Sequence, residues 1–166
     1  MTLRDLLLKK RTILVSKWVD VLIDSYPRET AAFLRSVKDP FANPLGGNCA
    51  QWLGVLFDEL AQHMDRVTIV TYVDRIVRIR AVQNFLPSQA IEFIPLLKKI
   101  IRVECAEQLR DSRLLSELEG FESSRIDILY DIAAAIYKEC KETLRSITMR
   151  RRERALRAAA MAGVCY

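Results

Sequence analysis

Arg80 lies at a position in the sequence where a charged side chain is unexpected. Successive residues of an α-helix rotate by about 100°. On a helix predicted over residues 67–84, the residues in the same sector as Arg80 are Ile69, Val73 and Ile76, joined by Gln83. This sector is an apolar stripe that faces the core, and a buried charge without a partner costs several kcal/mol. The sequence therefore predicts a polar partner for Arg80.

Two interpretations of Arg80 are open from the sequence. In the first, its guanidinium ties helix ends together through backbone carbonyls or through a carboxylate such as Glu92 or Asp127. In the second, it clamps an anionic or polar signal molecule in a small pocket. The residues predicted for that ligand-binding pocket are Arg80, Gln83, Ser88 and Gln89.

His63 is the only histidine, and it lies close to the apolar stripe of a helix predicted over residues 49–64. A histidine on the apolar face of a helical protein allows a haem hypothesis, with His63 as the iron ligand. The sequence offers no obvious second ligand, so we prefer a histidine at the core edge and expect no cofactor. The cysteines are too far apart for a zinc or redox motif, and we expect reduced thiols and no metal; they are Cys49, Cys105, Cys140 and Cys165.

Motifs of catalysis and of DNA reading are absent. The sequence has no Gly-rich phosphate loop, no nucleophile elbow and no zinc pattern. The helix predicted after Ser88 begins with apolar residues, whereas a recognition helix presents polar and basic side chains early. We therefore expect a protein that is not an enzyme and does not bind nucleic acid.

The formal net charge of +5 resides in residues 145–166, which hold six Arg and one Glu. The remaining residues carry equal numbers of acidic and basic side chains. The tail could contact an acidic partner protein; binding to an anionic surface or nucleic acid is the alternative, and a solvated helix end is the simplest interpretation. The candidate contact residues are Arg150, Arg151, Arg152 and Arg154.

Length and composition predict one all-α domain. With only five Gly and five Pro in 166 residues, the chain has too few turn formers for a β-sandwich. It has no signal peptide and no apolar run long enough to span a membrane, so we expect a cytoplasmic protein without integral membrane association. Residues 37–48 are predicted to be non-helical, with Phe41 and Leu45 pinning this loop to the core. About six helices are predicted, over residues 3–24, 27–36, 49–64, 67–84, 88–109 and 113–160. The fourth is supported by an Asp74–Arg78 pair at i,i+4, and Pro95 predicts a kink near residues 91–95 of the fifth.

The last predicted helix carries a 3-4 repeat of apolar residues that is typical of a coiled-coil seam. The seam ends after Ile147, because the next positions are arginines. We expect a homodimer formed through this helix, with residues 1–147 as a helical sensor-like domain and residues 148–166 as a basic extension or tail. The candidate seam residues are Ile126, Leu129, Ala133, Ile136 and Ile147.

A combination of short segments is spread over residues 5–147. They are Lys17-Trp18-Val19, Tyr26-Pro27, Lys38-Asp39-Pro40-Phe41-Ala42-Asn43-Pro44, Ile79-Arg80-Ala81-Val82-Gln83-Asn84-Phe85, Pro87-Ser88-Gln89-Ala90, Leu97-Lys98-Lys99-Ile100-Ile101-Arg102, and Phe121-Glu122-Ser123 with Arg125-Ile126-Asp127. Together they resemble the N-terminal domain family of the RsbR-type stressosome co-antagonists, and within it the RsbRD-like branch.

The resemblance implies a globin-like helical bundle, a sensor module that lacks haem and dimerises through terminal helices. In such proteins the module passes a signal along a long C-terminal helix to a STAS domain. This chain ends at Tyr166 with no STAS-sized segment. We therefore expect a stand-alone sensor module or an adaptor, whose partners are other signalling proteins.

Overall fold

The computed structural model describes residues 1–163, and within them all regular structure is helical, which confirms the all-α prediction. Cys165 and the end of the predicted tail lie outside the described residues. The helices are α1 (Leu3–Lys9), α2 (Arg11–Asp24), α3 (Arg28–Ser36), α4 (Pro44–Ala61), α5 (Arg66–Val82), α6 (Pro87–Ile91), α7 (Phe93–Glu104), the 3₁₀ turn η1 (Gln108–Arg110), α8 (Ser112–Phe121), the π-helical segment η2 (Glu122–Ile126) and α9 (Asp127–Ala162).

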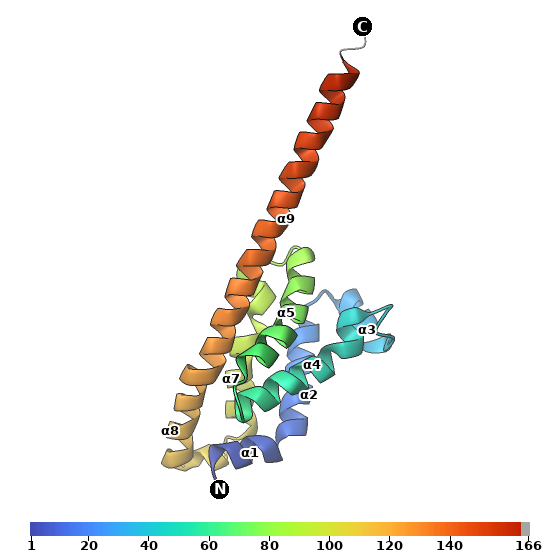
Figure 1. Ribbon diagram of the computed structural model, residues 1–166. Helices are drawn as coiled ribbons and strands as arrows, with labels where there is room; N and C mark the ends of the chain where they lie inside the picture. Colours follow the sequence, from blue (N-terminus) through green and yellow to red (C-terminus); the bar gives the residue numbers. More distant parts are fainter. Residues whose placement is uncertain (164–166) are drawn as a thin grey trace.

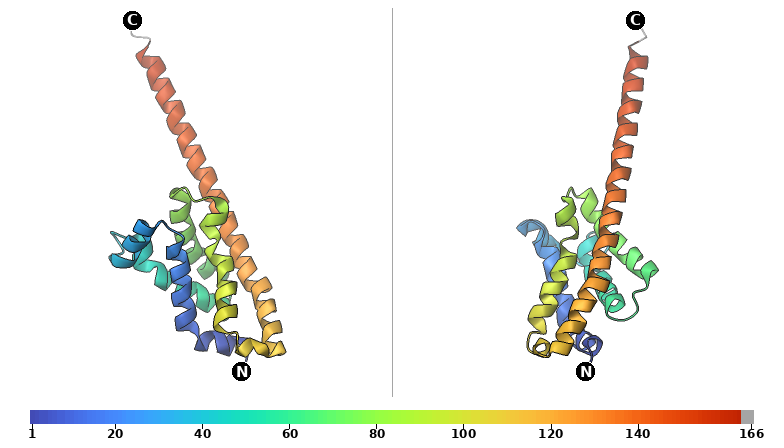
Figure 2. Two further views of the ribbon diagram at one scale, coloured as in Figure 1. Left: turned by 180° about the vertical axis from the view of Figure 1, so that it is seen from behind. Right: turned by 90° about the vertical axis from the view of Figure 1, so that its left-hand side faces the viewer.

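The helices form a bundle from which one helix projects (Figure 1). Helix α2 packs against α4 and α7, and α5 packs against α4 and α9. Helix α1 closes one end of the bundle beside α8, and the second half of α9 extends away from the opposite end (Figure 2). No helix among residues 1–163 combines the length and the apolar character that crossing a membrane would require.

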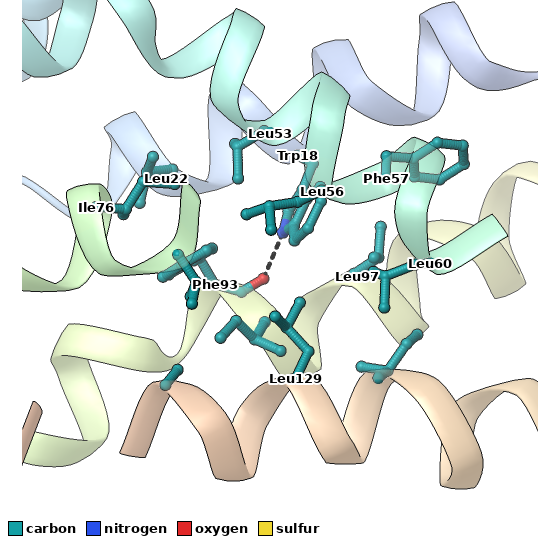
Figure 3. Close-up of a cluster of buried hydrophobic side chains, with 14 of the residues drawn as sticks. Trp18, Leu22, Leu53, Leu56, Phe57, Leu60, Ile76, Phe93, Leu97 and Leu129 are labelled. Carbon is teal, nitrogen blue, oxygen red and sulfur yellow. Dashed lines mark hydrogen bonds between the residues drawn. The ribbon is translucent and has the colours of Figure 1, made fainter. Parts of the chain in front are cut away.

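The core is built around Trp18 of α2, whose side chain is completely buried. Its indole Nε1 donates a hydrogen bond to the carbonyl oxygen of Phe93, 2.7 Å away, so the one polar atom of this ring is satisfied. Leucines from α2, α4, α7 and α9 surround the ring (Figure 3). Trp18 therefore joins the chain's early and late helices in one apolar cluster.

The helix predicted over residues 3–24 is divided at Lys10, where φ is −95° and ψ is 7°. Its start is as predicted, since Thr2 and Asp5 form a capping box. The division lets α1 turn across the end of the bundle, where its leucines are buried against α4 and α8. Lys10 Nζ donates to the carbonyl of Glu104, a contact in the folded bundle that local propensity does not encode.

The non-helical prediction for residues 37–48 is wrong from Pro44 onward, because α4 begins there. Pro is well tolerated at the first helical position, and the Asn43 side chain caps the helix by accepting a hydrogen bond from Gly46 N at 2.9 Å. A Cβ on Gly46 would lie 2.2 Å from the carbonyl oxygen of Leu34, so glycine permits this close approach of α3 and α4.

Leu45 and Phe41, the two apolar residues predicted to hold this segment to the core, differ in burial. Leu45 is buried as predicted, inside the first turn of α4. The prediction for Phe41 is wrong, because its side chain is 95% exposed. The segment is held instead by Asn43, whose Nδ2 donates to the carbonyl oxygens of Leu34 and Val37.

Replacing Trp18 by Ala is expected to lower the free energy of unfolding by about 3–5 kcal/mol, because it leaves a large cavity in the core. Phe41→Ala, the control, should change it by less than about 0.5 kcal/mol, since the ring is exposed. Urea denaturation followed by circular dichroism measures both. Equal losses for the two variants would contradict this description of the core.

Candidate functional site

Arg80 lies in the last turn of α5, and its side chain is 0% exposed. Its Nε donates to the carbonyl oxygen of Ala90 and its Nη2 to that of Gln89, both at 2.8 Å. The interpretation that Arg80 ties helix ends together through carbonyls is therefore confirmed. The carboxylates proposed as partners are not used: Asp127 pairs with Lys98, and Glu92 forms no hydrogen bond with Arg80 among the described residues.

The two carbonyls lie at the end of α6, where Pro95 interrupts the helical run. Its ring clashes with the carbonyl four residues earlier and it has no N–H to donate, so the predicted helix over residues 88–109 divides at Glu92 into α6 and α7. The sequence prediction of a kink near residues 91–95 is confirmed. The last carbonyls of α6 then lack their helical donors, and the guanidinium of Arg80 supplies N–H groups and a positive charge at this helix end.

Aromatic rings enclose the guanidinium. Its Cζ lies 4.1 Å from the ring centre of Phe85 and 5.0 Å from that of Tyr26, which favours a cation. Burial lowers the pKa of Arg80, and the nearby Tyr26 oxygen partly offsets this effect. Arg80 Nη1 is buried and has no hydrogen-bond partner among the described residues.

A groove of about 590 Å³ lies next to this guanidinium, between the α2–α3 turn on one side and the α5–α6 turn and the end of α6 on the other. Tyr26 and Phe85 line it and also cover Arg80. The Tyr26 hydroxyl donates to Gln83 Oε1 at 2.8 Å, and burial raises the pKa of Tyr26. Gln89 and Glu92 complete the opposite wall.

The structure brings three of the four predicted pocket residues together. Gln83 and Gln89 line the groove, while Arg80 lies beneath its floor rather than at its surface. Ser88 points elsewhere and lines a second groove of about 1040 Å³ between α6 and α9. The sequence argument missed Tyr26, although Tyr26-Pro27 already stood out among the segments of the family resemblance.

Tyr137 of α9 connects the two grooves. Its ring lines the second groove, and its hydroxyl donates to the carbonyl oxygen of Phe85 at 2.7 Å. Phe85 is thus held by α9 through its backbone and contacts the Arg80 guanidinium through its ring. Phe85 therefore links the buried Arg80 charge to α9.

The predicted seam requires a correction. Its first four residues are buried in the protomer's own core, because η2 packs against α7 and the first half of α9 packs against α5, α6 and α7. These residues are Ile126 at the end of η2, and Leu129, Ala133 and Ile136 of α9. They cannot form a surface between two protomers. Only Ile147, which is 41% exposed, remains available. The four candidate arginines are exposed on the projecting part of α9, at Arg150, Arg151, Arg152 and Arg154.

The haem hypothesis loses its structural basis. His63 lies in the turn after α4, where its side chain is exposed and does not face the core. Within the described part of the chain, no group of three or more His, Cys, Asp or Glu side chains gathers as metal ligands would. Cys49, Cys105 and Cys140 are buried free thiols, as predicted, and burial raises the pKa of the first two.

Replacing Arg80 by Lys is expected to reduce the free energy of unfolding by about 2–4 kcal/mol. A lysine cannot donate to both carbonyls in the same fixed geometry, and it leaves charged and polar groups buried without partners. Arg78→Lys is the matched control on the same helix, where the exposed pair with Asp74 should keep the change below about 0.5 kcal/mol. Urea denaturation compares the two, and an unchanged midpoint for Arg80→Lys would contradict the capping role.

The family model described as "RsbT co-antagonist protein rsbRD N-terminal domain" matches residues 13–154, which is most of the chain. No curated protein and no solved structure gives a significant match, so the globin-like arrangement stays a prediction. With a match of this extent, the chain belongs to the family of RsbT co-antagonist rsbRD N-terminal domains, a family of stressosome-associated regulatory modules.

Proposed function

We propose that the chain is a non-catalytic cytoplasmic signalling module that works as a homodimer and contacts other signalling proteins through α9. The observation that carries the proposal is the division of α9 into two parts. Up to Leu144 the helix packs against the bundle, and from Arg145 to Ala162 every side chain is exposed. One continuous helix thus joins the core, including the Phe85 contact, to a free surface.

The projecting part of α9 needs a partner. It spans 18 residues, which corresponds to about 27 Å of helix. Most helical stability in proteins comes from packing rather than from propensity, and this segment has no packing within the protomer. A second helix laid along it would supply the missing contacts.

The surface that a second copy would cover lies on one side of α9. Thr148, Ala155 and Ala162 follow Leu144 at spacings of four and seven residues, and Ile147 flanks them. This line begins at the mouth of the groove between α6 and α9, where Tyr137 and Leu144 are among the lining residues. A symmetric helix pair would bury Ile147 and continue the apolar surface of the body.

The arginines on the projecting helix oppose a close pairing of two copies. Residues 145–162 carry six Arg and one Glu, and like charges within about one Debye length repel. We therefore assign Ile147 and Thr148 to the homodimer and the exposed Arg150–Arg154 cluster to an acidic partner protein. The two contacts respond to salt in opposite directions.

Sedimentation of the wild-type chain at tens of micromolar is expected to give a dimer. Ile147→Glu should weaken dimerisation by at least about tenfold, since it places an acidic charge in the apolar contact. The matched control is Met149→Glu, whose position is rotated by roughly 160° from Ile147 on the helix. A monomeric wild type, or equal effects of the two variants, would count against the proposed dimer surface.

The dimer is expected to become tighter when salt is raised from about 0.05 to 0.5 M, because screening reduces the repulsion between arginines. Binding of a poly-glutamate probe to the Arg150–Arg154 cluster should weaken over the same range. Sedimentation and fluorescence anisotropy measure the two effects. A dimer that dissociates in salt would mean that ion pairs, and not Ile147, hold it together.

A further inference from the structure

One charged donor in the core has no partner. Arg80 Nη1 and Gln108 Oε1 are the two buried side-chain atoms of the described residues that lack a hydrogen bond, and only the first belongs to a charged group. A buried donor left unsatisfied costs about 1–3 kcal/mol, and more when it is charged. Capping the end of α6 uses Nε and Nη2 and gives no reason for the third nitrogen.

The guanidinium that carries this nitrogen lies next to a groove lined by Tyr26, Gln83, Phe85, Gln89 and Glu92. Two of these residues, Tyr26 and Phe85, stack their rings around the guanidinium. The groove volume of about 590 Å³ lies within the usual range of small-molecule sites. Its walls carry hydroxyl and amide groups at Ser25, Thr30, Gln83, Asn84 and Gln89.

We propose that this groove binds a small hydroxylated monocarboxylate, with a carboxylate oxygen accepting a hydrogen bond from Arg80 Nη1. A carboxylate is the natural partner of a guanidinium nitrogen in a low-dielectric site. The hydroxyl and amide walls suit a ligand that carries several hydroxyl groups.

The single charge of the ligand follows from Glu92. Its carboxylate lines the same groove and attracts Arg80 without pairing with it. Arg80 and Glu92 leave the site close to neutral, so a second anionic group on the ligand would meet Glu92 and be repelled. Phosphate dianions and dicarboxylates are therefore disfavoured.

Tyr26 must move before the carboxylate of a ligand in the groove can reach Arg80 Nη1. The Tyr26 hydroxyl donates to Gln83 Oε1 and helps to close the groove floor over Arg80. A ligand that displaces this contact exchanges a neutral hydrogen bond for a charge-assisted one, which is roughly twice as strong. The exchange favours binding.

Ligand binding at Arg80 would also affect the contact between Phe85 and α9. A carboxylate at Arg80 competes with the Phe85 ring for the guanidinium, and the carbonyl of Phe85 is held by the Tyr137 hydroxyl. This step rests on the proposed signalling function, whereas the binding site itself does not.

The test titrates the full chain with sodium gluconate, and with sorbitol and malate as neutral and dianionic comparisons, at constant ionic strength. Calorimetry is expected to give a dissociation constant below about 10 mM for gluconate and one at least tenfold higher for malate. Sorbitol should give no detectable binding. Amide shifts in ¹H–¹⁵N spectra should be confined to residues 25–30 and 80–92 at the site, and to the contact with Tyr137.

Variants keep the proposal falsifiable even if Arg80 cannot be replaced without unfolding. Glu92→Gln, an exposed position, should tighten malate binding at least fivefold, and Glu139→Gln on α9 should leave it unchanged. Absence of gluconate binding, shifts elsewhere in the spectrum, or equal effects of the two variants would overturn the proposal. If gluconate does not bind but Ile147→Glu still weakens dimerisation as expected, the ligand site is disproved and the dimer proposal stands.

Discussion

The fold depends on how the protein handles one interrupted helix. Pro95 divides the helical run after Leu86, and the break exposes the last carbonyls of α6 inside the bundle. The Arg80 guanidinium satisfies two of them from the end of α5. Because the cap comes from a different helix, the α5–α6 turn, the position of Phe85 and the entry of α7 are fixed together. Trp18 Nε1 then joins α2 to the same region through the carbonyl of Phe93.

The second organising feature is the change of environment along α9. Its first half completes the core, and its second half has no neighbour in the protomer. The run from α8 into α9 is continuous through the π-helical segment η2, where Glu122 is held by two hydrogen bonds from Arg102. The segment η2 joins α8 to α9 without a break in the helical backbone and allows their axes to differ in direction. A shift of α9 against α5 and α6 would therefore also displace the projecting part, because both belong to one continuous helix.

Sequence reasoning succeeded where one local rule decides the outcome. The 100° rotation placed Arg80 in the core, Asp74 paired with Arg78 at i,i+4, and Pro95 marked the helix break. It failed where tertiary contacts choose between two locally acceptable states. The Pro-Gly segment at 44–47 begins a helix because Asn43 caps it, and the division at Lys10 depends on the distant Glu104. The 3-4 repeat from Ile126 correctly predicted a packed face, but periodicity does not say whether the packing partner is the same chain or a second one.

The chemistry at Arg80 also bears on why a charge is buried here at all. Helices commonly end with a glycine or with donors from nearby backbone, which satisfy carbonyls without burying an ion. Buried ionic groups can often be replaced by apolar residues without loss of stability, so capping alone is a weak reason for a guanidinium. The aromatic enclosure by Phe85 and Tyr26 lowers the cost of the cation, and both residues also line the groove, so an anion in the groove reaches the guanidinium only when Tyr26 moves. The Arg80 guanidinium caps α6 with two of its nitrogens, and its third nitrogen has no partner among the described residues, so it can accept a bound anion as well as hold the helix end. Phe85 contacts this guanidinium through its ring and α9 through its carbonyl, so the proposed anion site lies one hydrogen bond from α9.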